Sequence, residues 1–538
     1  MAATVMSTTL EPRLENAIQK AKEVHNVTFE LRDKQRECIE HLVISKKDVL
    51  AILPTGYGKT VVYALLPTIL SEMSNEPSSV LVISPLKALM QDQVKRLRDM
   101  NVEAICVTDD SNTEDEMKQL HKGAYQVLLF SPEALCLEKW RAVLKVYEQT
   151  VSAIVVDEAH CVQQWGEEFR EDYARIAEIR SFLPGASMLA MTATAPPDTA
   201  NKIMKTLQMV DPVVVTASLN RANIFYECHK HKGDPLTCFG WLLKDLKDKS
   251  VHCPKVIIYC RNIKNCSILF SMFMEQLGDF GFIGQDGYRN RLFAMYHHST
   301  AKKIKDYVVK SFTEKNSTVR VVIATIAFGM GVDAPDISTV VHYGASRSMM
   351  SFAQESGRAG RSPDLNARSL VYYHMMDTTV ISTDKATQEF CRNPSRKCLR
   401  AMLFQFFTPG QKPPIAAPLH KCCSVCAELC DCGKCNVILL PPKENSSTTT
   451  VTYEEVAVQI VTEEQKAAIK TGLINLRATY DCDMLTTAAI LTGLSDQVIS
   501  DIVNNIECIC SYEDLESGYV FDNSIAAHVW DVISLCLF

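Results

Sequence analysis

The chain has 538 residues, of which 47% are hydrophobic and 22% charged, so a wholly disordered chain is excluded and three or four folded domains are expected. No run of about 18 apolar residues occurs, and residues 1–17 lack the apolar stretch of a signal peptide, which favours the nucleus or the cytosol over a membrane. The net charge of −7 is uneven, since residues 441–538 carry 4 basic and 15 acidic side chains. The first 440 residues carry 52 basic and 48 acidic ones, so a nucleic-acid partner is not excluded there.

Short apolar runs alternate with helical stretches after a polar helical lead-in at 1–28. The runs expected to form strands are 49–53, 80–84, 126–130, 153–156 and 188–191, then 255–260, 320–324, 339–343 and 369–373. Such strands predict parallel sheets covered on both faces, in two tandem α/β domains at 29–215 and 216–375. A small helical, Cys-rich module at 376–436 and a mostly helical acidic region at 437–538 complete the expected organisation.

The first candidate site is a phosphate loop between an expected strand and an expected helix. It reads Leu53-Pro54-Thr55-Gly56-Tyr57-Gly58-Lys59-Thr60. The two glycines allow backbone N–H groups to face phosphates at a helix N-terminus, so residues 54–60 are expected to bind the nucleotide. Lys59 would reach the β and γ phosphates, and Thr60 would give a hydroxyl to Mg²⁺. An ordinary glycine turn is the alternative, because Leu53 stands where the general pattern has glycine.

Two carboxylates, Asp157 and Glu158, directly follow the expected strand at 153–156. The carboxyl end of a strand, opposite a phosphate loop, is where a Mg²⁺ ligand is expected. Asp157 would hold the metal through water, and Glu158 would orient or deprotonate the water that attacks ATP. Together with the phosphate loop, this pair predicts Mg²⁺-dependent ATP hydrolysis.

An aromatic-rich segment follows the carboxylates and reads Cys161-Val162-Gln163-Gln164-Trp165-Gly166-Glu167-Glu168-Phe169-Arg170. Trp165 and Phe169, beside Arg170, offer faces on which unpaired bases can stack, each worth roughly 1–3 kcal/mol. Because the segment is so close in sequence to the carboxylates, base contact could be felt at the ATP site. The alternative is that these aromatic side chains belong to the core.

The order of these motifs resembles superfamily 2 helicases, and specifically the RecQ family of DNA helicases. Further stretches are similar to family motifs at 84–93, 131–133, 192–194, 324–333 and 354–361, and the resemblance covers about residues 29–426. It implies two RecA-like domains with ATP in the cleft between them, single-stranded and forked DNA as partners, and ATP-driven 3′→5′ movement that unwinds duplex. A role in DNA repair or recombination is implied as well.

The resemblance also implies roles for single residues outside the two catalytic motifs. Gln35 would contact the adenine base. Arg221, Asn223 and His297 match weaker family positions for contacts to the DNA strand, and an ordinary polar surface is the alternative for each of them.

Arg358 and Arg361 are the candidate catalytic residues of the second domain. Two arginines three residues apart on a helix share one face. A guanidinium that faces the γ-phosphate stabilises the charge of the transition state, so both are expected to act on ATP. Surface salt bridges are the alternative.

Eight of the 21 cysteines lie between residues 391 and 435. Cys398, His420, Cys423 and Cys426 give the spacing C-x21-H-x2-C-x2-C, with ligand types that fit tetrahedral Zn²⁺. RecQ proteins have a four-cysteine zinc module at this point of the chain.

The third zinc ligand departs from the family pattern. By spacing it is His420, and Cys422 is the alternative. Cys430, Cys432 and Cys435 are not required by the family pattern, and they offer alternative ligands or a second site. Plain free thiols are the remaining interpretation.

Strand separation by this chain is in question, because many RecQ proteins continue with a winged-helix domain and no basic winged helix is evident after residue 435. A DNA-stimulated ATPase or translocase without robust unwinding is therefore the first alternative to a helicase. A non-catalytic DNA-binding module is disfavoured by the intact Lys59, Asp157, Glu158 and Arg361. An RNA helicase is disfavoured by the aromatic segment.

Overall fold

The structure, a computed structural model, describes residues 2–435 and 461–537 apart from gaps. The longer gaps are 108–112, 162–175, 330–333, 379–382, 481–491 and 516–522. The chain forms two compact units. The first unit comprises 1–221, 329–333 and 404–414, and the second unit comprises 222–328, 334–403 and 415–538.

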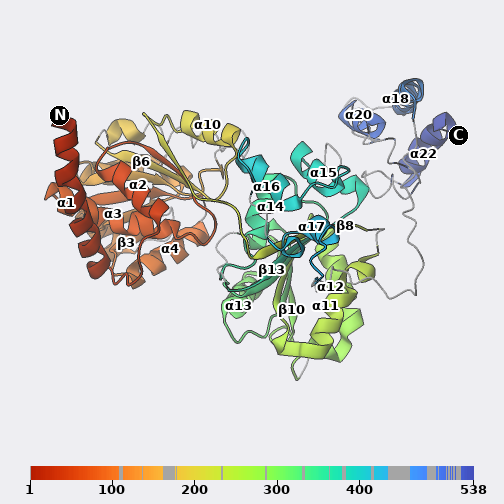
Figure 1. The fold of residues 1–538 in the computed structure, drawn as a ribbon, viewed down its shortest axis with the longest axis horizontal. Helices are drawn as coiled ribbons and strands as arrows, with labels where there is room; N and C mark the ends of the chain where they lie inside the picture. The colour runs from red at the N-terminus through yellow and green to blue at the C-terminus, as the bar shows by residue number, and fades with distance from the viewer. Residues whose placement is uncertain are drawn as a thin grey trace. The chain divides into compact units, whose positions relative to one another are not determined.

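A parallel sheet of seven strands forms the centre of the first unit, in the order β3-β4-β2-β5-β6-β1-β7 (Figure 1). Its strands are β1 (Val49–Ile52), β2 (Ser79–Ile83), β3 (Ala104–Val107), β4 (Val127–Phe130), β5 (Val151–Val156), β6 (Ser187–Thr192) and β7 (Val213–Thr216). Successive residues of a strand point to opposite faces, so the neighbours Leu50 and Ala51 belong to two different apolar clusters. Both faces of the sheet are therefore buried, as the continuous apolar runs predicted.

The helices of the first unit surround this sheet. They are α1 (Ala2–Val24), α2 (Asp33–Val43), α3 (Lys59–Ser74), α4 (Lys87–Asp99), α5 (Glu114–His121), α6 (Pro132–Leu135), α7 (Glu138–Val146) and α10 (Pro197–Thr206). Leu14, Ile18 and Ala21 of α1 are buried in the same cluster as α3. The N-terminal helix is thus part of the core of the first unit.

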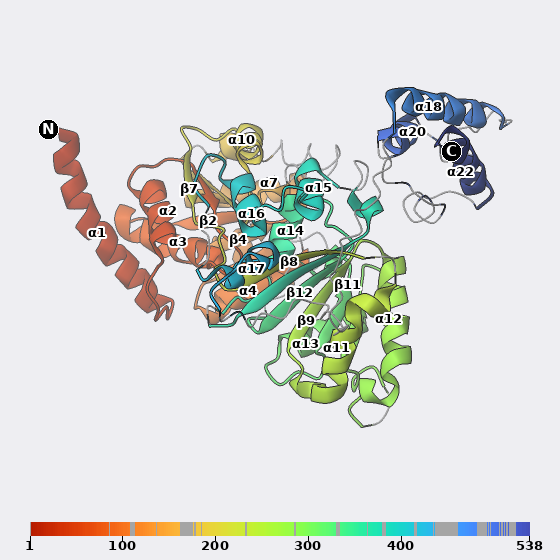
Figure 2. The ribbon, with the colours of Figure 1, turned by 45° about the vertical axis from the view of Figure 1, so that its right-hand side comes forward.

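The second unit has a parallel sheet of six strands in the order β10-β11-β9-β12-β13-β8. Its strands are β8 (Ile224–Lys230), β9 (Lys255–Cys260), β10 (Phe293–Tyr296), β11 (Val321–Ala324), β12 (Ile337–Tyr343) and β13 (Ala367–Tyr373). Its helices are α11 (Pro235–Lys249), α12 (Ile263–Leu277), α13 (Lys302–Thr313), α14 (Met349–Ser356) and α15 (Lys385–Arg392), with 3₁₀ turns η1 (Ser250–His252), η2 (Gly278–Gly281), η3 (Ile326–Phe328) and η4 (Met375–Thr378). Figure 2 shows α11 and α12 along one face of the sheet, where Phe239 and Phe273 join its core.

Helical segments follow the second sheet. They are α16 (Leu399–Phe407), η5 (Leu419–Lys421) and α17 (Ser424–Glu428) in the Cys-rich module, and α18 (Glu463–Ala478), α20 (Asp496–Asn504) and α22 (Asn523–Leu537) in the acidic tail. The tail helices share an apolar cluster of their own that includes Ile469, Ile502 and Val529. In the described ranges, no helix is both long enough and apolar enough to cross a membrane. The expected fold class, two RecA-like sheets followed by a Cys-rich module and a helical tail, is confirmed.

Candidate nucleotide and metal sites

The phosphate loop joins the end of β1 to the start of α3 in the first unit. Gly56 and Gly58 have φ angles of 77° and 86°, in the left-handed region that favours glycine. Gly58 is the N-cap of α3, so the backbone N–H groups of the loop lie at the N-terminus of this helix, where its dipole favours a bound phosphate. The Lys59 ammonium donates to the Leu53 carbonyl oxygen at 3.3 Å, which keeps the side chain over its own loop.

Gln35 fastens this loop to α2. Its Nε2 donates to the carbonyl oxygens of Tyr57 and Gly58 at 3.0 and 2.9 Å, while its Oε1 accepts from the Arg32 N–H at 2.8 Å. A Cβ at Gly58 would lie 2.6 Å from the Gln35 Nε2, so the close approach requires glycine. Both polar ends of Gln35 are thus engaged, and contact with adenine would require the exchange of one of these bonds.

Asp157 follows β5 and is buried. Its carboxylate accepts from the Gln93 Nε2 at 2.7 Å and from the Glu158 N–H at 2.9 Å. Burial raises the pKa of Asp157 to about 6, and the neighbouring charge of Glu158 adds to this, while Lys59 acts in the opposite direction. The hydrogen bonds and the charge of Lys59 do not offset the cost of burying the Asp157 charge, so a bound cation would stabilise this carboxylate.

Gln93 was not singled out from the sequence as a site residue. It lies on α4, which follows β2, and β2 is the neighbour of β5 in the sheet. Sequence spacing alone does not show this adjacency, although Gln93 falls within the family-like stretch 84–93. The side chain is buried and positions the carboxylate of Asp157.

The carboxylates are linked to β6 through His160. The Nδ1 of His160 lies 3.1 Å from the Thr192 Oγ1 and 3.3 Å from the Glu158 Oε2. The Thr192 hydroxyl donates to the Thr194 carbonyl oxygen at 3.0 Å, so it accepts from His160. Burial lowers the pKa of His160, which favours the neutral ring. The stretch 192–194 is therefore hydrogen-bonded to the acidic motif.

The residues expected to hold Mg²⁺ have the donor chemistry for it. Thr60 supplies a hydroxyl at the start of α3, and Asp157 supplies a carboxylate at the end of β5. Mg²⁺ prefers hard oxygen ligands of this kind and usually retains several waters. Glu158 has a φ of 48°, an unfavourable angle for a residue other than glycine, of the kind often found at functional sites.

Arg358 and Arg361 lie beyond α14 in the second unit, because that helix ends at Ser356. The expectation that a helix gives both arginines one face is therefore wrong. A turn carries them instead, and in it the Arg358 N–H donates to the Glu355 carbonyl oxygen at 3.2 Å. Gly360 makes this turn with a φ of 58°.

A buried polar network supports the arginine turn. The Glu355 carboxylate lies 2.9 Å from the His342 Nε2 and accepts from the Ser346 hydroxyl at 2.9 Å. His342 stacks on Tyr259, with ring centroids 5.7 Å apart. Burial raises the pKa of Tyr259 to about 12, against the lowering effect of the Arg358 charge.

Asn223 closes the far side of the same turn. Its Nδ2 donates to the carbonyl oxygens of Gly360, Ser362 and Leu365 at 2.8, 3.1 and 2.9 Å. A Cβ at Gly360 would lie 2.7 Å from this nitrogen. The amide nitrogen therefore supports the turn, and a contact of Asn223 with DNA would have to use its Oδ1. Arg221, two residues earlier, is partly exposed.

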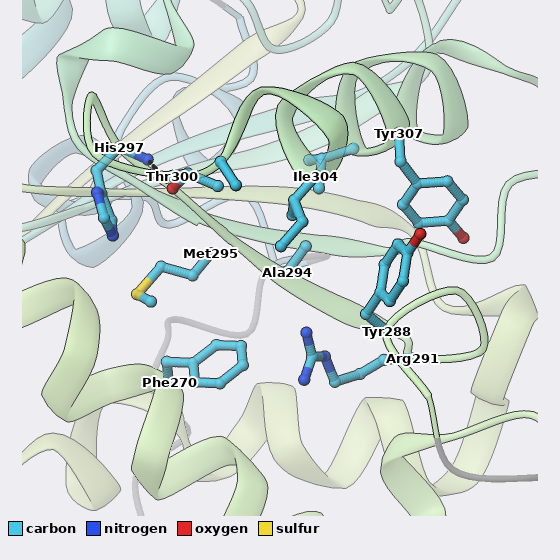
Figure 3. A pocket seen from close by; sticks show the side chains of 11 residues that line it. Phe270, Tyr288, Arg291, Ala294, Met295, His297, Thr300, Ile304 and Tyr307 are labelled. Carbon is cyan, nitrogen blue, oxygen red and sulfur yellow. Dashed lines mark hydrogen bonds between the residues drawn. The ribbon is translucent and has the colours of Figure 1, made fainter.

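His297 follows the edge strand β10 and lines a cavity of about 280 Å³ together with Phe270, Met295 and Tyr307 (Figure 3). The backbone N–H of His297 donates to the Thr300 hydroxyl at 3.0 Å. Its ring Nδ1 is buried and has no hydrogen-bond partner among the described residues. Burial lowers the pKa of His297, and the charges of His298 and Lys305 lower it further.

Several predicted site residues lie outside the described residues. They are Trp165, Phe169 and Arg170 of the aromatic segment. Positions 330–333 of the stretch 324–333 are outside them as well. The DNA-contacting role of the aromatic segment stays a prediction.

The Cys-rich module brings four cysteines together, namely Cys398, Cys422, Cys423 and Cys426, which we call the first cluster. Their ligand atoms lie within 4.8 Å of one another, and the Cys398 Sγ is 3.5 Å from the Cys422 Sγ and 3.9 Å from the Cys423 Sγ. The position expected for His420 is thus taken by Cys422, the alternative ligand. The reason is local: Cys422 and Cys423 follow η5 directly, whereas the His420 ring on η5 lies against other cysteines.

The first cluster has the chemistry of a structural metal site. Tetrahedral Zn²⁺ with Zn–S bonds of about 2.3 Å separates its sulfurs by about 3.8 Å, which is close to the observed distances. None of the four cysteines forms a disulfide, and Cys422, Cys423 and Cys426 are buried. These residues can hold a metal ion.

Two family models match the chain. The model "DEAD/DEAH box helicase" matches residues 32–203, and "Helicase conserved C-terminal domain" matches residues 241–363. The first match contains the phosphate loop and the carboxylates, and the second contains the arginine turn. Both matches end before the Cys-rich module.

Curated relatives cover more of the chain. RecQ-like DNA helicase BLM of Xenopus laevis is 33% identical over 361 residues, which is 65% of this chain and 24% of that protein. ATP-dependent DNA helicase Q1 of Mus musculus is 31% identical over 72% of this chain and 59% of its own length. ATP-dependent DNA helicase RecQ of Pasteurella multocida (strain Pm70) is 30% identical over 79% of this chain and 63% of its own length. The chain thus spans less than two thirds of each of these relatives.

Solved structures share the fold at low identity. Helicase MrfA bound to DNA and AMPPNP has a TM-score of 0.56 at 18% identity and covers 74% of this chain and 53% of that one. Mycobacterium smegmatis Lhr bound to single-stranded DNA and AMP-PNP has a TM-score of 0.53 at 18% identity, covering 76% and 52%. The motifs, both helicase models and the matched relatives agree, and the chain belongs to the RecQ family of superfamily 2 helicases.

Proposed function

We propose that the chain is an ATP-dependent DNA helicase that moves 3′→5′ on single-stranded DNA and unwinds duplex, with a nuclear role in DNA repair or recombination. The observation that carries this proposal is that the phosphate loop and the carboxylates Asp157 and Glu158 lie at the same edge of the first sheet, an arrangement that we call the half-site. There the phosphate loop follows β1 and the carboxylates follow β5. The strand β6 lies between β1 and β5 in the sheet, and the hydrogen bond between His160 and Thr192 connects it to the carboxylates.

Each residue of the half-site has a separate role in ATP hydrolysis. Lys59 binds the phosphates as a point charge, and the loop N–H groups orient them. Glu158 orients or deprotonates the attacking water. Thr60, and Asp157 through water, would hold Mg²⁺, which would supply positive charge to neutralise the phosphates. Arg358 and Arg361 add positive charge for the transition state.

DNA binding is coupled to this site through the aromatic segment. Cys161 is buried, and its N–H donates to the Glu158 carbonyl oxygen at 2.9 Å. The segment that carries Trp165 and Phe169 begins at this residue, so a displacement caused by base stacking has a short covalent route to the carboxylates. Arg221, the last residue of the first segment of the first unit, and His297 of the second unit are proposed to contact the DNA strand.

Zinc is the ion that we propose for the first cluster, because four thiolates favour it over hard cations. Its role is structural. The Arg400 guanidinium, two residues after Cys398, donates to the Cys422 carbonyl oxygen at 3.3 Å. An isolated parallel bridge joins Tyr226 of β8 to Cys423, so the metal would fasten the module to the second sheet.

A translocase without robust unwinding is the second candidate. Among the described residues after 460, the structure has helices and no strand, and residues 441–538 carry 4 basic and 15 acidic side chains. A β-hairpin that would split the duplex is therefore not observed in the described part of this region.

A paired assay tests the two candidates. Forked DNA unwinding and displacement of streptavidin from biotinylated single strands are measured with wild-type protein and with Lys59→Ala. A helicase gives ATP-dependent activity in both assays, and a translocase gives it only in the second. Displacement from the 5′ end alone supports 3′→5′ movement. Activity in neither assay, with normal folding, would reject both candidates.

A further inference from the structure

A second group of metal ligands lies beside the first cluster. It consists of His420 on η5 and of Cys430, Cys432 and Cys435 after α17, and we call it the second cluster. His420 is buried, whereas Cys432 and Cys435 are exposed. No residue belongs to both clusters.

The three sulfurs of the second cluster converge on one nitrogen. The His420 Nδ1 lies 3.5 Å from the Cys430 Sγ, 3.2 Å from the Cys432 Sγ and 3.6 Å from the Cys435 Sγ. A ring nitrogen offers either one proton or one lone pair, so it cannot hydrogen-bond well to three thiols at once. An ion at the centre of the four atoms accounts for the convergence.

The distances fit a single tetrahedral ion. With Zn–S bonds of about 2.3 Å and a Zn–N bond of about 2.0 Å, neighbouring nitrogen and sulfur ligands lie about 3.5 Å apart. All four ligand atoms lie within 4.8 Å of one another. A two-iron cluster would instead distribute them over two metal ions.

A disulfide does not explain the arrangement. The sulfurs of Cys432 and Cys435 are 3.4 Å apart, and both cysteines are free. An S–S bond is about 2.05 Å long.

We propose that the chain binds a second zinc ion through the His420 Nδ1 and the thiolates of Cys430, Cys432 and Cys435. Ligands of the two ions then alternate along the chain. His420 precedes Cys422, Cys423 and Cys426 of the first cluster, and Cys430, Cys432 and Cys435 follow them.

The second ion would close the segment 420–435 around α17. Leu419 and Leu429, which flank this segment or lie within it, are 38% and 64% exposed, so apolar burial contributes little to holding it. Because Cys432 and Cys435 are exposed, a chelator would reach the second ion before the first. The two ions are therefore expected to leave at different rates.

The test measures zinc in the full chain, purified without chelator, by elemental analysis. Wild-type protein is expected to hold two zinc ions. Cys432→Ser and His420→Ala are each expected to hold one. The control Cys536→Ser, outside both clusters, is expected to hold two.

X-ray absorption of the zinc in wild-type protein keeps the test independent of whether a variant folds. Two ions give on average about three and a half sulfur ligands and half a nitrogen ligand per zinc, whereas a four-cysteine site alone gives four sulfurs. Release to a chelator should show a fast and a slow phase, and Cys432→Ser should lose the fast one.

Three results would overturn the proposal. One is a single zinc per chain with all-sulfur ligands. Another is iron with acid-labile sulfide in place of zinc. The third is a Cys432–Cys435 disulfide, detected by mass spectrometry, in protein that was purified under reducing conditions.

Discussion

The phosphate loop of the first unit is supported by a buried apolar sheet, whereas the part of the Cys-rich module that carries most of its metal ligands, residues 408–435, has almost no apolar core of its own. All four residues of β1 are buried, and Gln35 fastens the loop that follows the strand. Between residues 408 and 435, the buried apolar side chains of the described residues are those of Cys422, Cys423 and Cys426. Burial of apolar surface thus preforms the nucleotide site, while residues 408–435 are expected to depend on their metal ligands for folding.

The largest expected effect separates chemistry from folding in the first unit. Lys59→Ala should lower ATP turnover by at least about a hundredfold, because it removes a charge from the phosphates. The circular dichroism spectrum and the unfolding temperature should stay close to those of wild type, since the hydrogen bond that Lys59 makes among the described residues is to a loop carbonyl oxygen.

Lys20→Ala is the matched control, because Lys20 is exposed and forms a surface pair with Glu72 at 2.6 Å. It should keep wild-type turnover. Wild-type turnover in Lys59→Ala would reject the phosphate-loop assignment.

A substitution in the Cys-rich module is expected to impair folding, whereas Lys59→Ala is expected to impair only ATP turnover. Cys426→Ser should remove the zinc of the first cluster and unfold residues 390–436, because a structural metal contributes folding energy directly. Limited proteolysis should cut within this region while the two sheets stay protected. Protection equal to wild type in a zinc-free variant would show that the module folds without metal.

DNA coupling is tested in the segment that follows the carboxylates. Trp165→Ala should weaken the affinity for single-stranded DNA by about five- to 150-fold, the equivalent of losing one stacking contact of roughly 1–3 kcal/mol. ATP binding without DNA should be unchanged. Trp165→Ala should also lose most of the stimulation of ATP turnover by DNA, whereas Trp165→Phe keeps an aromatic face and should retain most of it. Unchanged DNA stimulation in Trp165→Ala would show that this tryptophan does not couple DNA binding to ATP hydrolysis.

The smallest expected effect concerns Gln93, which acts through Asp157. Gln93→Ala should reduce turnover about tenfold and raise the Mg²⁺ concentration needed for half-maximal activity, as is typical when a group that orients a metal ligand is lost. Gln91→Ala, on the exposed face of the same helix, is the control. An unchanged Mg²⁺ requirement would leave Gln93 with a packing role only.

The interior of both sheets could be predicted from the sequence, but their edges could not. The runs 49–53, 80–84, 126–130, 153–156 and 188–191 correspond to strands inside or near the centre of the first sheet. The strands that were not predicted are β3, β7, β8 and β10, and these are the four edge strands. Each edge strand has at least one residue that is not buried, and the apolar pattern of β8 is interrupted by Glu227, His229 and Lys230. The strands β3, β7 and β10 are largely apolar but only four residues long, so their sequences do not distinguish them from short apolar loops.

The site residues show a similar limit. The positions of Lys59 at the start of α3 and of Asp157 after β5 could be predicted, because each lies next to a recognisable strand and its motif is local. Gln93 required the adjacency of β2 and β5, and the choice of Cys422 over His420 required the turn of η5. Interactions between distant segments are fixed by topology, which spacing along the chain does not encode.

ATP hydrolysis by this chain is expected to be stimulated by single-stranded DNA. The most direct measurement is steady-state ATP turnover of the wild-type chain as the concentration of single-stranded DNA is raised, with single-stranded RNA of the same sequence as the comparison. We expect low basal turnover, saturable stimulation by DNA and weaker stimulation by RNA. Turnover that is absent at every DNA concentration, or that is the same with and without DNA, would contradict this expectation.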